Sequence, residues 1–137
     1  MNDALRIMLL DDDAFMLELL QEMIDGLGYT HVHADSDARS ALQALSDFRP
    51  DVLICDLSMP EMDGIEFLRT VAEGGFWGIV ILLSGMDSGI LRAAETLAVA
   101  QGLTILGARS KPLTRAALAD LLALARGRAA PVHGDGK

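Results

Sequence analysis

The chain has 137 residues, of which 51% are hydrophobic, so it can bury the core of one domain but is too short for two ordinary ones. Its formal net charge of −9 argues against direct binding to nucleic acid, because such binding depends on Lys and Arg, and its 11 Lys and Arg residues form no cluster. No basic segment followed by an apolar leader occurs, and no apolar run approaches the roughly 20 residues that span a bilayer. We therefore expect a cytoplasmic protein that does not contact a membrane.

Five short runs have the pattern of β-strands, either continuously apolar or alternating, and turn-forming residues bound them. In chain order they are residues 6–10, 29–34, 52–55, 76–83 and 104–109. The third run, VLIC, is typical of a strand buried on both faces of a parallel sheet. It contains the only cysteine, Cys55, which we expect to be a core residue in a reducing compartment. Trp77 stands at the start of the fourth run, where we expect it to pack against the core.

A segment with apolar residues at helical spacing follows each strand. In chain order these helices are expected over residues 14–27, 37–48, 65–74, 91–100 and 114–126. Asp13 is the expected N-cap of the first helix, Ser36 or Asp37 of the second, and Thr114 of the last. Five strands alternating with five helices predict an α/β fold in which helices cover both faces of a parallel sheet. Residues 127–137 lack periodicity and predict a disordered tail or the start of a linker after a domain over residues 1–126.

Polar residues stand where four of the five strands end. Asp11 and Asp12 follow the first strand, Asp56 the third, Ser84 the fourth and Lys111 the fifth. The carboxyl ends of parallel strands share one edge of a sheet, where ligands bind in open α/β folds. Three carboxylates placed there repel one another and require a cation, for which Mg²⁺ is the suitable oxygen-binding ion.

This group of side chains suits phosphoryl transfer to a carboxylate. Mg²⁺ and Lys111 together can stabilise the charge on the equatorial oxygens while a carboxylate such as Asp56 attacks phosphorus. A nearby hydroxyl can then donate a hydrogen bond to one of those oxygens. We therefore expect a site that forms an acyl phosphate and senses it.

The strings LLDDD, DLSMPEMDG, LLSG and SKP, in this order, resemble the receiver domain of two-component response regulators over about residues 5–125. The resemblance implies a flavodoxin-like, doubly wound, five-stranded parallel sheet with strand order 2-1-3-4-5. It implies a phosphorylation-activated switch rather than an enzyme, one that catalyses only its own phosphotransfer and dephosphorylation. The expected partner is a histidine kinase or phosphotransfer protein, and a second copy of the chain is a further candidate.

The resemblance also implies a role for each site residue. Asp56 would accept the phosphoryl group, and Asp12, Asp56 and the backbone carbonyl of Ser58 would bind Mg²⁺. Asp11 would contribute to the metal site mainly through a water. Lys111 would pair with the phosphoryl group and precede a cis peptide bond to Pro112.

The switch in this family pairs a hydroxyl, here Ser84, with an aromatic side chain on the fifth strand. The corresponding position is Ala108, so we expect Ser84 and a shift of the loop over residues 85–89 to carry the signal. Ser58 and Met86 flank the route of attacking water in the family and should tune the lifetime of the acyl phosphate. The segment from Ser84 to Lys111 is also similar to receivers that precede EAL-type cyclic-di-GMP phosphodiesterase domains.

Two other functions compete with this interpretation. A haloacid-dehalogenase-like phosphatase with Asp11 as nucleophile also uses a strand-end Asp, a D-x-D motif, a Ser and a Lys. In this chain, however, no acidic pair follows Lys111 to complete the metal site of such a phosphatase. The phosphatase interpretation also leaves DLSMPEMDG unexplained. A degenerate receiver that acts only as a binding module is disfavoured by the full set of strand-end residues.

Overall fold

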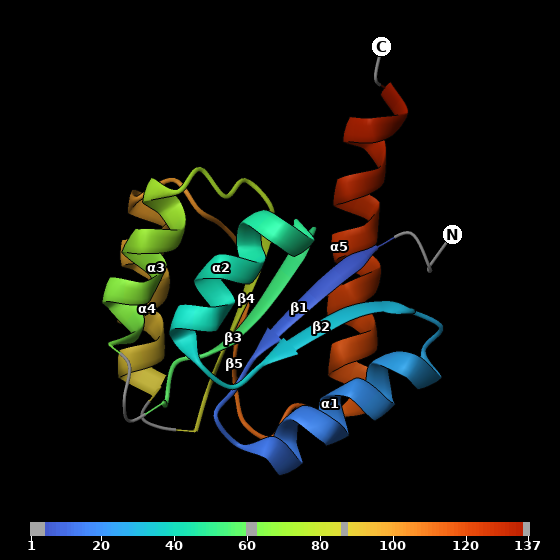
Figure 1. The fold of residues 1–137 in the computed structure, drawn as a ribbon, viewed down its shortest axis with the longest axis horizontal. Helices are drawn as coiled ribbons and strands as arrows, with labels where there is room; N and C mark the ends of the chain where they lie inside the picture. Colours follow the sequence, from blue (N-terminus) through green and yellow to red (C-terminus); the bar gives the residue numbers. More distant parts are fainter. Residues whose placement is uncertain (1–4, 60–62, 86–87, 136–137) are drawn as a thin grey trace.

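The computed structural model describes residues 5–59, 63–85 and 88–135, whose course Figure 1 traces. Strands and helices alternate along the chain. The elements are β1 (Arg6–Leu10), α1 (Ala14–Gly26), β2 (His31–Asp35), α2 (Ala38–Phe48), β3 (Val52–Asp56), α3 (Gly64–Glu73), β4 (Ile79–Ser84), α4 (Ser88–Ala100), β5 (Thr104–Ser110) and α5 (Arg115–Asp135). The expected α/β alternation is therefore confirmed.

The strands form one parallel sheet in the order β2-β1-β3-β4-β5. This is the strand order that the receiver resemblance implies. Helices α1 and α5 cover one face of the sheet, and α2, α3 and α4 cover the other, as Figure 1 shows. All described carboxyl ends of the strands consequently lie along one edge.

The burial of each strand explains its sequence pattern. Every residue of β3 and β4 is buried, since both faces of these central strands contact helices. Edge strands β2 and β5 are only partly buried, and their sequences are correspondingly more polar. The continuous apolar runs are thus the central strands.

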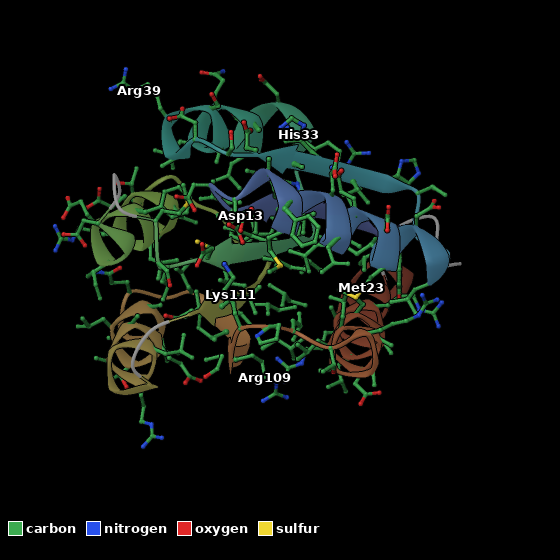
Figure 2. All side chains as sticks on the ribbon, turned by 90° about the horizontal axis from the view of Figure 1, so that it is seen from below. Asp13, Met23, His33, Arg39, Arg109 and Lys111 are labelled. Atoms are coloured by element: carbon green, nitrogen blue, oxygen red, sulfur yellow. The ribbon has the colours of Figure 1, made fainter. Side chains whose placement is uncertain are left out.

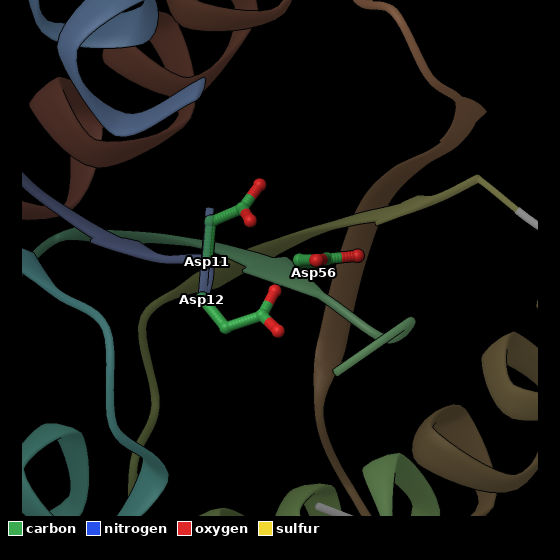
Figure 3. Close-up of side chains that lie close together, drawn as sticks. All are labelled: Asp11, Asp12 and Asp56. Carbon is green, nitrogen blue, oxygen red and sulfur yellow. The ribbon is translucent and has the colours of Figure 1, made fainter. Parts of the chain in front are cut away.

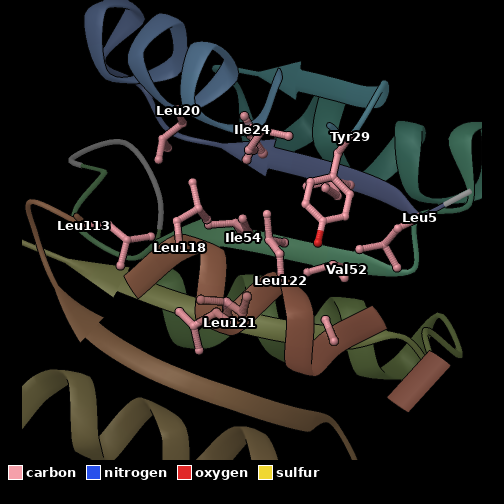
Figure 4. Packing of buried hydrophobic residues seen from close by; sticks show 14 of the residues in the cluster. Leu5, Leu20, Ile24, Tyr29, Val52, Ile54, Leu113, Leu118, Leu121 and Leu122 are labelled. Atoms are coloured by element: carbon pink, nitrogen blue, oxygen red, sulfur yellow. The ribbon is translucent and has the colours of Figure 1, made fainter. Parts of the chain in front are cut away.

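Two apolar clusters hold the helices to the sheet. On one face, Leu20 and Ile24 of α1 meet Leu118 and Leu122 of α5 across Ile54, an arrangement drawn in Figure 4. Residues of α2, α3 and α4 form the second cluster on the other face. Full burial of one such aliphatic side chain contributes roughly 1.5–3 kcal/mol, so these contacts fix the relative positions of the strand ends.

Three helices begin at an aspartate that caps the first turn. Asp13 accepts hydrogen bonds from the backbone N–H groups of Phe15 and Met16, and Asp37 accepts one from Ser40. Asp63 does the same at the start of α3. The expected cap Asp13 is confirmed, and of the two candidates Ser36 and Asp37 the structure has Asp37 as the cap of α2.

Helix α2 ends through a contact from a distant strand. Its C-cap Arg49 has a φ of 55°, in the left-handed region. The Arg6 guanidinium at the start of β1 donates to the Phe48 carbonyl oxygen over 2.9 and 2.7 Å and lies 4.2 Å from the centre of the Phe48 ring. A cation at this position also suits the negative end of the helix dipole.

Trp77 does not pack against the core, contrary to our expectation. Its side chain is 77% exposed, whereas Phe76 packs against the second cluster. The chain passes so close to Asp51 at Gly78 that a Cβ there would lie 2.8 Å from the Asp51 carbonyl oxygen and 2.5 Å from the Phe76 ring. Trp77 therefore lies outside the core. It lines a cavity of about 560 Å³ at the amino ends of β3 and β4.

The backbone of α5 continues to Asp135 and so includes most of the segment for which the sequence predicts a disordered tail or the start of a linker. Extending an existing helix adds one hydrogen bond per residue without a new nucleation step, which explains how a segment without apolar periodicity can follow it. A role of this segment as a linker stays a prediction. Within the described ranges, no helix is both long and apolar enough to cross a membrane.

Replacing the N-cap of α2 (Asp37→Ala) should lower the free energy of unfolding at pH 7. Hydrogen bonds from the Ser40 backbone and hydroxyl lower the pKa of Asp37 below its ordinary value of 3.8. Stabilisation by Asp37 is therefore present above pH 3.8 and is lost as the pH falls through the lowered value. Urea unfolding from pH 7 to pH 2.5 should show the two proteins converging at the acid end. Asp47→Ala, at the opposite end of α2, is the control and should not destabilise the protein.

The thiol of Cys55 should be protected from reagents in the folded protein. It is fully buried, and its pKa is raised by burial and by the nearby charges of Asp56 and Asp11. Its reaction with Ellman's reagent should be slower than in the unfolded chain by a factor on the order of 10³ or more, which reflects the small unfolded fraction. An exposed cysteine introduced by Ser46→Cys in a Cys55→Ser background is the control. Rapid modification of Cys55 without unfolding would contradict its place in the core.

Candidate functional site

Four strand ends bring polar side chains to one edge of the sheet. Asp11 follows β1 directly, Asp56 and Ser84 are the last residues of β3 and β4, and Lys111 follows β5. Figure 2 shows Lys111 near the middle of the molecule, between the strand ends, whereas Arg39 points outward. The convergence expected from the sequence is therefore present.

The acidic residues form a compact group. Asp11, Asp12 and Asp56 each offer a carboxylate oxygen, and these three atoms lie within 4.8 Å of one another (Figure 3). Asp11 and Asp56 are buried, whereas Asp12 is exposed. Like charges this close raise the free energy of the folded state unless a cation is near.

Lys111 supplies a positive charge to this group. Its Nζ donates to Oδ2 of Asp11 over 3.0 Å and to Oδ2 of Asp56 over 3.3 Å. The Lys111–Pro112 peptide bond is cis, as the resemblance implies. Three carboxylates and one ammonium still leave the group negative when all are ionised, so it can accept a further cation.

Backbone amides orient the other oxygen of each buried carboxylate. The Asp13 amide donates to Oδ1 of Asp11, and the Ser58 amide donates to Oδ1 of Asp56, each over 2.9 Å. Each buried carboxylate is thus held by an amide on one oxygen and by Lys111 on the other. Such hydrogen bonds offset the cost of burying the charges and fix their direction.

The pKa values at this site move in directions set by burial and by opposite charge. Burial raises the pKa of Asp11, and the Asp56 charge acts in the same direction, while the Asp13 amide and Lys111 oppose the shift. Burial by itself would lower the pKa of Lys111, but its hydrogen bonds and attraction to Asp11 and Asp56 outweigh this, so the pKa is raised. Lys111 therefore remains an ammonium at neutral pH.

The hydroxyl groups form a second part of the site. Ser84 is buried, and its Oγ lies 3.2 Å from Oγ of Ser58. The Ser58 hydroxyl also accepts a hydrogen bond from the Gly85 amide over 2.9 Å. Sequence reasoning expected the Ser58 carbonyl to bind metal and its side chain to border the water route, but missed this contact with Ser84. No local pattern indicates it, because residue 58 reaches residue 84 only through the pairing of β3 with β4.

Two expectations concern residues near the switch hydroxyl. Ala108 pairs with Leu82 in the register of β4 and β5, so a methyl group occupies the position where the family has an aromatic ring. Met86 lies outside the described residues, as does part of the loop over residues 85–89. Their expected roles stay predictions.

The donor set fits a hard divalent cation. All three carboxylates offer oxygen, and magnesium is characteristically bound through one or two carboxylates together with waters and phosphate oxygens. Neither thiolate nor imidazole belongs to this group of three, so it lacks the ligands that favour zinc. These residues are consistent with the magnesium site that the resemblance implies.

Known proteins share this sequence and this fold. A protein-glutamate methylesterase/protein-glutamine glutaminase from Treponema denticola is 37% identical over 85 residues, which cover 61% of this chain and 23% of the relative. Chemotaxis protein CheY from Thermotoga maritima is 32% identical over 68 residues, which cover 50% of this chain and 57% of that protein. The chain thus spans less than two thirds of either curated relative.

A solved structure extends the likeness to nearly the whole fold. The response regulator from Colwellia psychrerythraea superposes with a TM-score of 0.77 at 34% identity, covering 90% of this chain and 98% of that one. The family model described as response regulator receiver domain matches residues 7–123, which contain all four strand ends described above. The chain therefore belongs to the response regulator receiver domains, the phosphorylation-activated switches of two-component signalling.

Proposed function

We propose that Asp56 accepts a phosphoryl group from a histidine kinase or phosphotransfer protein and that the domain relays this event as a change of conformation. One observation carries the proposal. Asp56 is buried at the end of β3, with the Lys111 ammonium 3.3 Å from Oδ2 and two further carboxylates beside it. Asp56 ends β3, the central strand of the sheet. The other two carboxylates follow β1 on one side of it, and Ser84 and Lys111 stand at the ends of β4 and β5 on the other side.

In the proposed transfer, one carboxylate oxygen of Asp56 attacks phosphorus in line with the bond to the donor nitrogen. The O–P bond forms as the P–N bond breaks, and the imidazole of the donor histidine leaves with the electron pair. Lys111 lies where it can stabilise the charge on the transferring group. The Ser84 hydroxyl donates to a phosphoryl oxygen afterwards, which links the modification to the end of β4.

Asp11, Asp12, Asp56 and the backbone carbonyl of Ser58 are the residues that we propose to hold Mg²⁺. The bound ion would neutralise charge on the phosphoryl oxygens and on the carboxylates themselves. Asp11 and Asp56 are already oriented by the amides of Asp13 and Ser58. These two hydrogen bonds therefore fix the direction of two of the three carboxylates before an ion binds.

Signalling places an energetic demand on this site. Moving a conformational equilibrium from 1:99 to 99:1 takes about 5.5 kcal/mol of differential interaction. One hydrogen bond from Ser84, even to a charged acceptor, contributes only about 1.5–3 kcal/mol. The rest of this free energy must come from Lys111 and the backbone near Gly85, or from a partner that binds the phosphorylated conformation.

Two further proposals concern the catalysis of the domain and its connection to the rest of a longer protein. We propose that its only catalysis is its own phosphotransfer and dephosphorylation, and that residues 127–137 begin a linker after the receiver domain over residues 1–126. The methylesterase relative extends well beyond the aligned region, which supports a connection to an output domain. An EAL-type output and a homodimer stay predictions.

Acetyl phosphate with Mg²⁺ should add one phosphoryl group to the wild-type chain, seen as a mass increase of about 80 Da. Asp56→Asn should abolish the adduct, because an amide is a far weaker nucleophile than a carboxylate. Borohydride reduction of the acyl phosphate followed by peptide mass spectrometry should locate it at Asp56. A label on Asp11 would instead support a phosphatase of the haloacid dehalogenase class, and no label would support a degenerate receiver.

Mg²⁺ should stabilise the folded protein, and Asp12→Asn should remove most of this effect. A ligand at 100 times its dissociation constant adds about 2.7 kcal/mol to the free energy of unfolding. In buffer without divalent cations the variant should be more stable than wild type, since one of three repelling carboxylates is gone. Urea unfolding with and without MgCl₂ measures both effects. Asp25→Asn, exposed at the far end of α1, is the control and should respond to Mg²⁺ like wild type.

A further inference from the structure

The side chain of Ser58 connects two loops that leave the sheet at neighbouring strands. Its Oγ lies 3.2 Å from the Ser84 Oγ at the end of β4 and accepts the Gly85 amide over 2.9 Å. Its own amide donates to Oδ1 of Asp56 over 2.9 Å. One residue therefore contacts the proposed phosphoacceptor through its backbone and the proposed switch hydroxyl through its side chain.

The hydrogen-bonding capacity of these hydroxyls limits what they can do together. A serine hydroxyl has one donor and two acceptor positions. In Ser58 one acceptor is used by the Gly85 amide, which leaves the second acceptor and the O–H for Ser84. Either hydroxyl can be the donor in this contact, and in both cases the contact with Ser58 holds the Ser84 hydroxyl in one orientation in the state without phosphate. A phosphoryl oxygen on Asp56 has only acceptor positions, so it needs the Ser84 proton.

Gly85 lies beside both parts of the site. A Cβ at this position would be 4.0 Å from Ser58 Oγ and 4.0 Å from the Lys111 Cδ. The Ser58 hydroxyl therefore restrains the backbone next to Ser84 at a point that borders the stem of Lys111. The same Ser58 hydroxyl contacts Ser84, so a reorientation of Ser84 toward Asp56 breaks one of its two contacts.

We propose that the Ser58 side chain is a positioning residue that holds the Ser84 hydroxyl and the Gly85 amide in the unphosphorylated state, and that phosphorylation must displace it. The inference rests on the proposed function of Asp56. It assigns Ser58 a role through its hydroxyl, separate from its carbonyl. Loss of that hydroxyl should make the phosphorylated conformation easier to reach.

The experiment measures binding of beryllofluoride, a stable mimic of the phosphoryl group, by titration calorimetry in the presence of Mg²⁺. Ser58→Ala should bind about 3- to 10-fold more tightly than wild type, the size expected for one neutral hydrogen bond lost from the competing state. Ser58→Thr keeps the hydroxyl and should retain the wild-type affinity. Ser46→Ala, exposed on α2 and remote from the site, is the matched serine control.

A double-mutant cycle tests whether Ser58 acts through Ser84. In a Ser84→Ala background, removing the Ser58 hydroxyl should change the affinity by less than about 1.5-fold, because no switch hydroxyl remains to be held. The Gly85 amide resonance of Ser58→Ala without ligand should also shift toward its position in the liganded wild type. A structural effect on stability alone would not move this resonance in that direction.

Several results would overturn the inference. Equal or weaker binding by Ser58→Ala would show that its hydroxyl assists the liganded state or has no role. A tighter affinity that persists without Ser84 would show a direct effect on the ligand. These outcomes leave the proposed function intact. A wild-type protein that binds no beryllofluoride with Mg²⁺ would instead overturn the role of Asp56, and the inference with it.

Discussion

Two buried carboxylates held beside one ammonium are the interaction on which the functional part of this molecule depends. Asp11 and Asp56 would repel each other at the ends of adjacent strands, and each hydrogen-bonds to Lys111. Because the carboxylates are buried, their charges are screened little by solvent and interact strongly. The residual negative charge is the basis on which we propose that the site binds a cation and, with it, a phosphoryl group.

The sheet and its two apolar clusters serve to hold this arrangement. Strands β1, β3 and β4 are adjacent and almost completely buried, so their carboxyl ends cannot move independently without disturbing the core. The hydroxyl pair of Ser58 and Ser84 lies next to these carboxylates, where two loops leave the sheet. A carboxylate fixed by the core beside a hydroxyl pair is a suitable basis for the switch proposed above.

The sequence alone was sufficient for the order and type of the elements. Apolar periodicity and helix caps depend on residues within one or two turns of each other, and the caps at Asp13 and Asp37 were identified on this basis. The strand-end residues Asp56 and Lys111 were also identified from the sequence, because parallel strands share one carboxyl edge. Local patterns failed at Trp77, where the path of the backbone rather than hydrophobicity decides the outcome.

Contacts between distant segments were decided only by the tertiary structure. The sequence determined that carboxylates, a hydroxyl and an ammonium meet at one edge, but the pairing register sets which atoms touch. Lys111 reaches Asp11 across 100 positions, and Ser58 reaches Ser84 across 26. Arg6 likewise ends α2 by donating to the carbonyl of Phe48. Such contacts depend on the three-dimensional course of several elements at once, which no local stretch of sequence encodes.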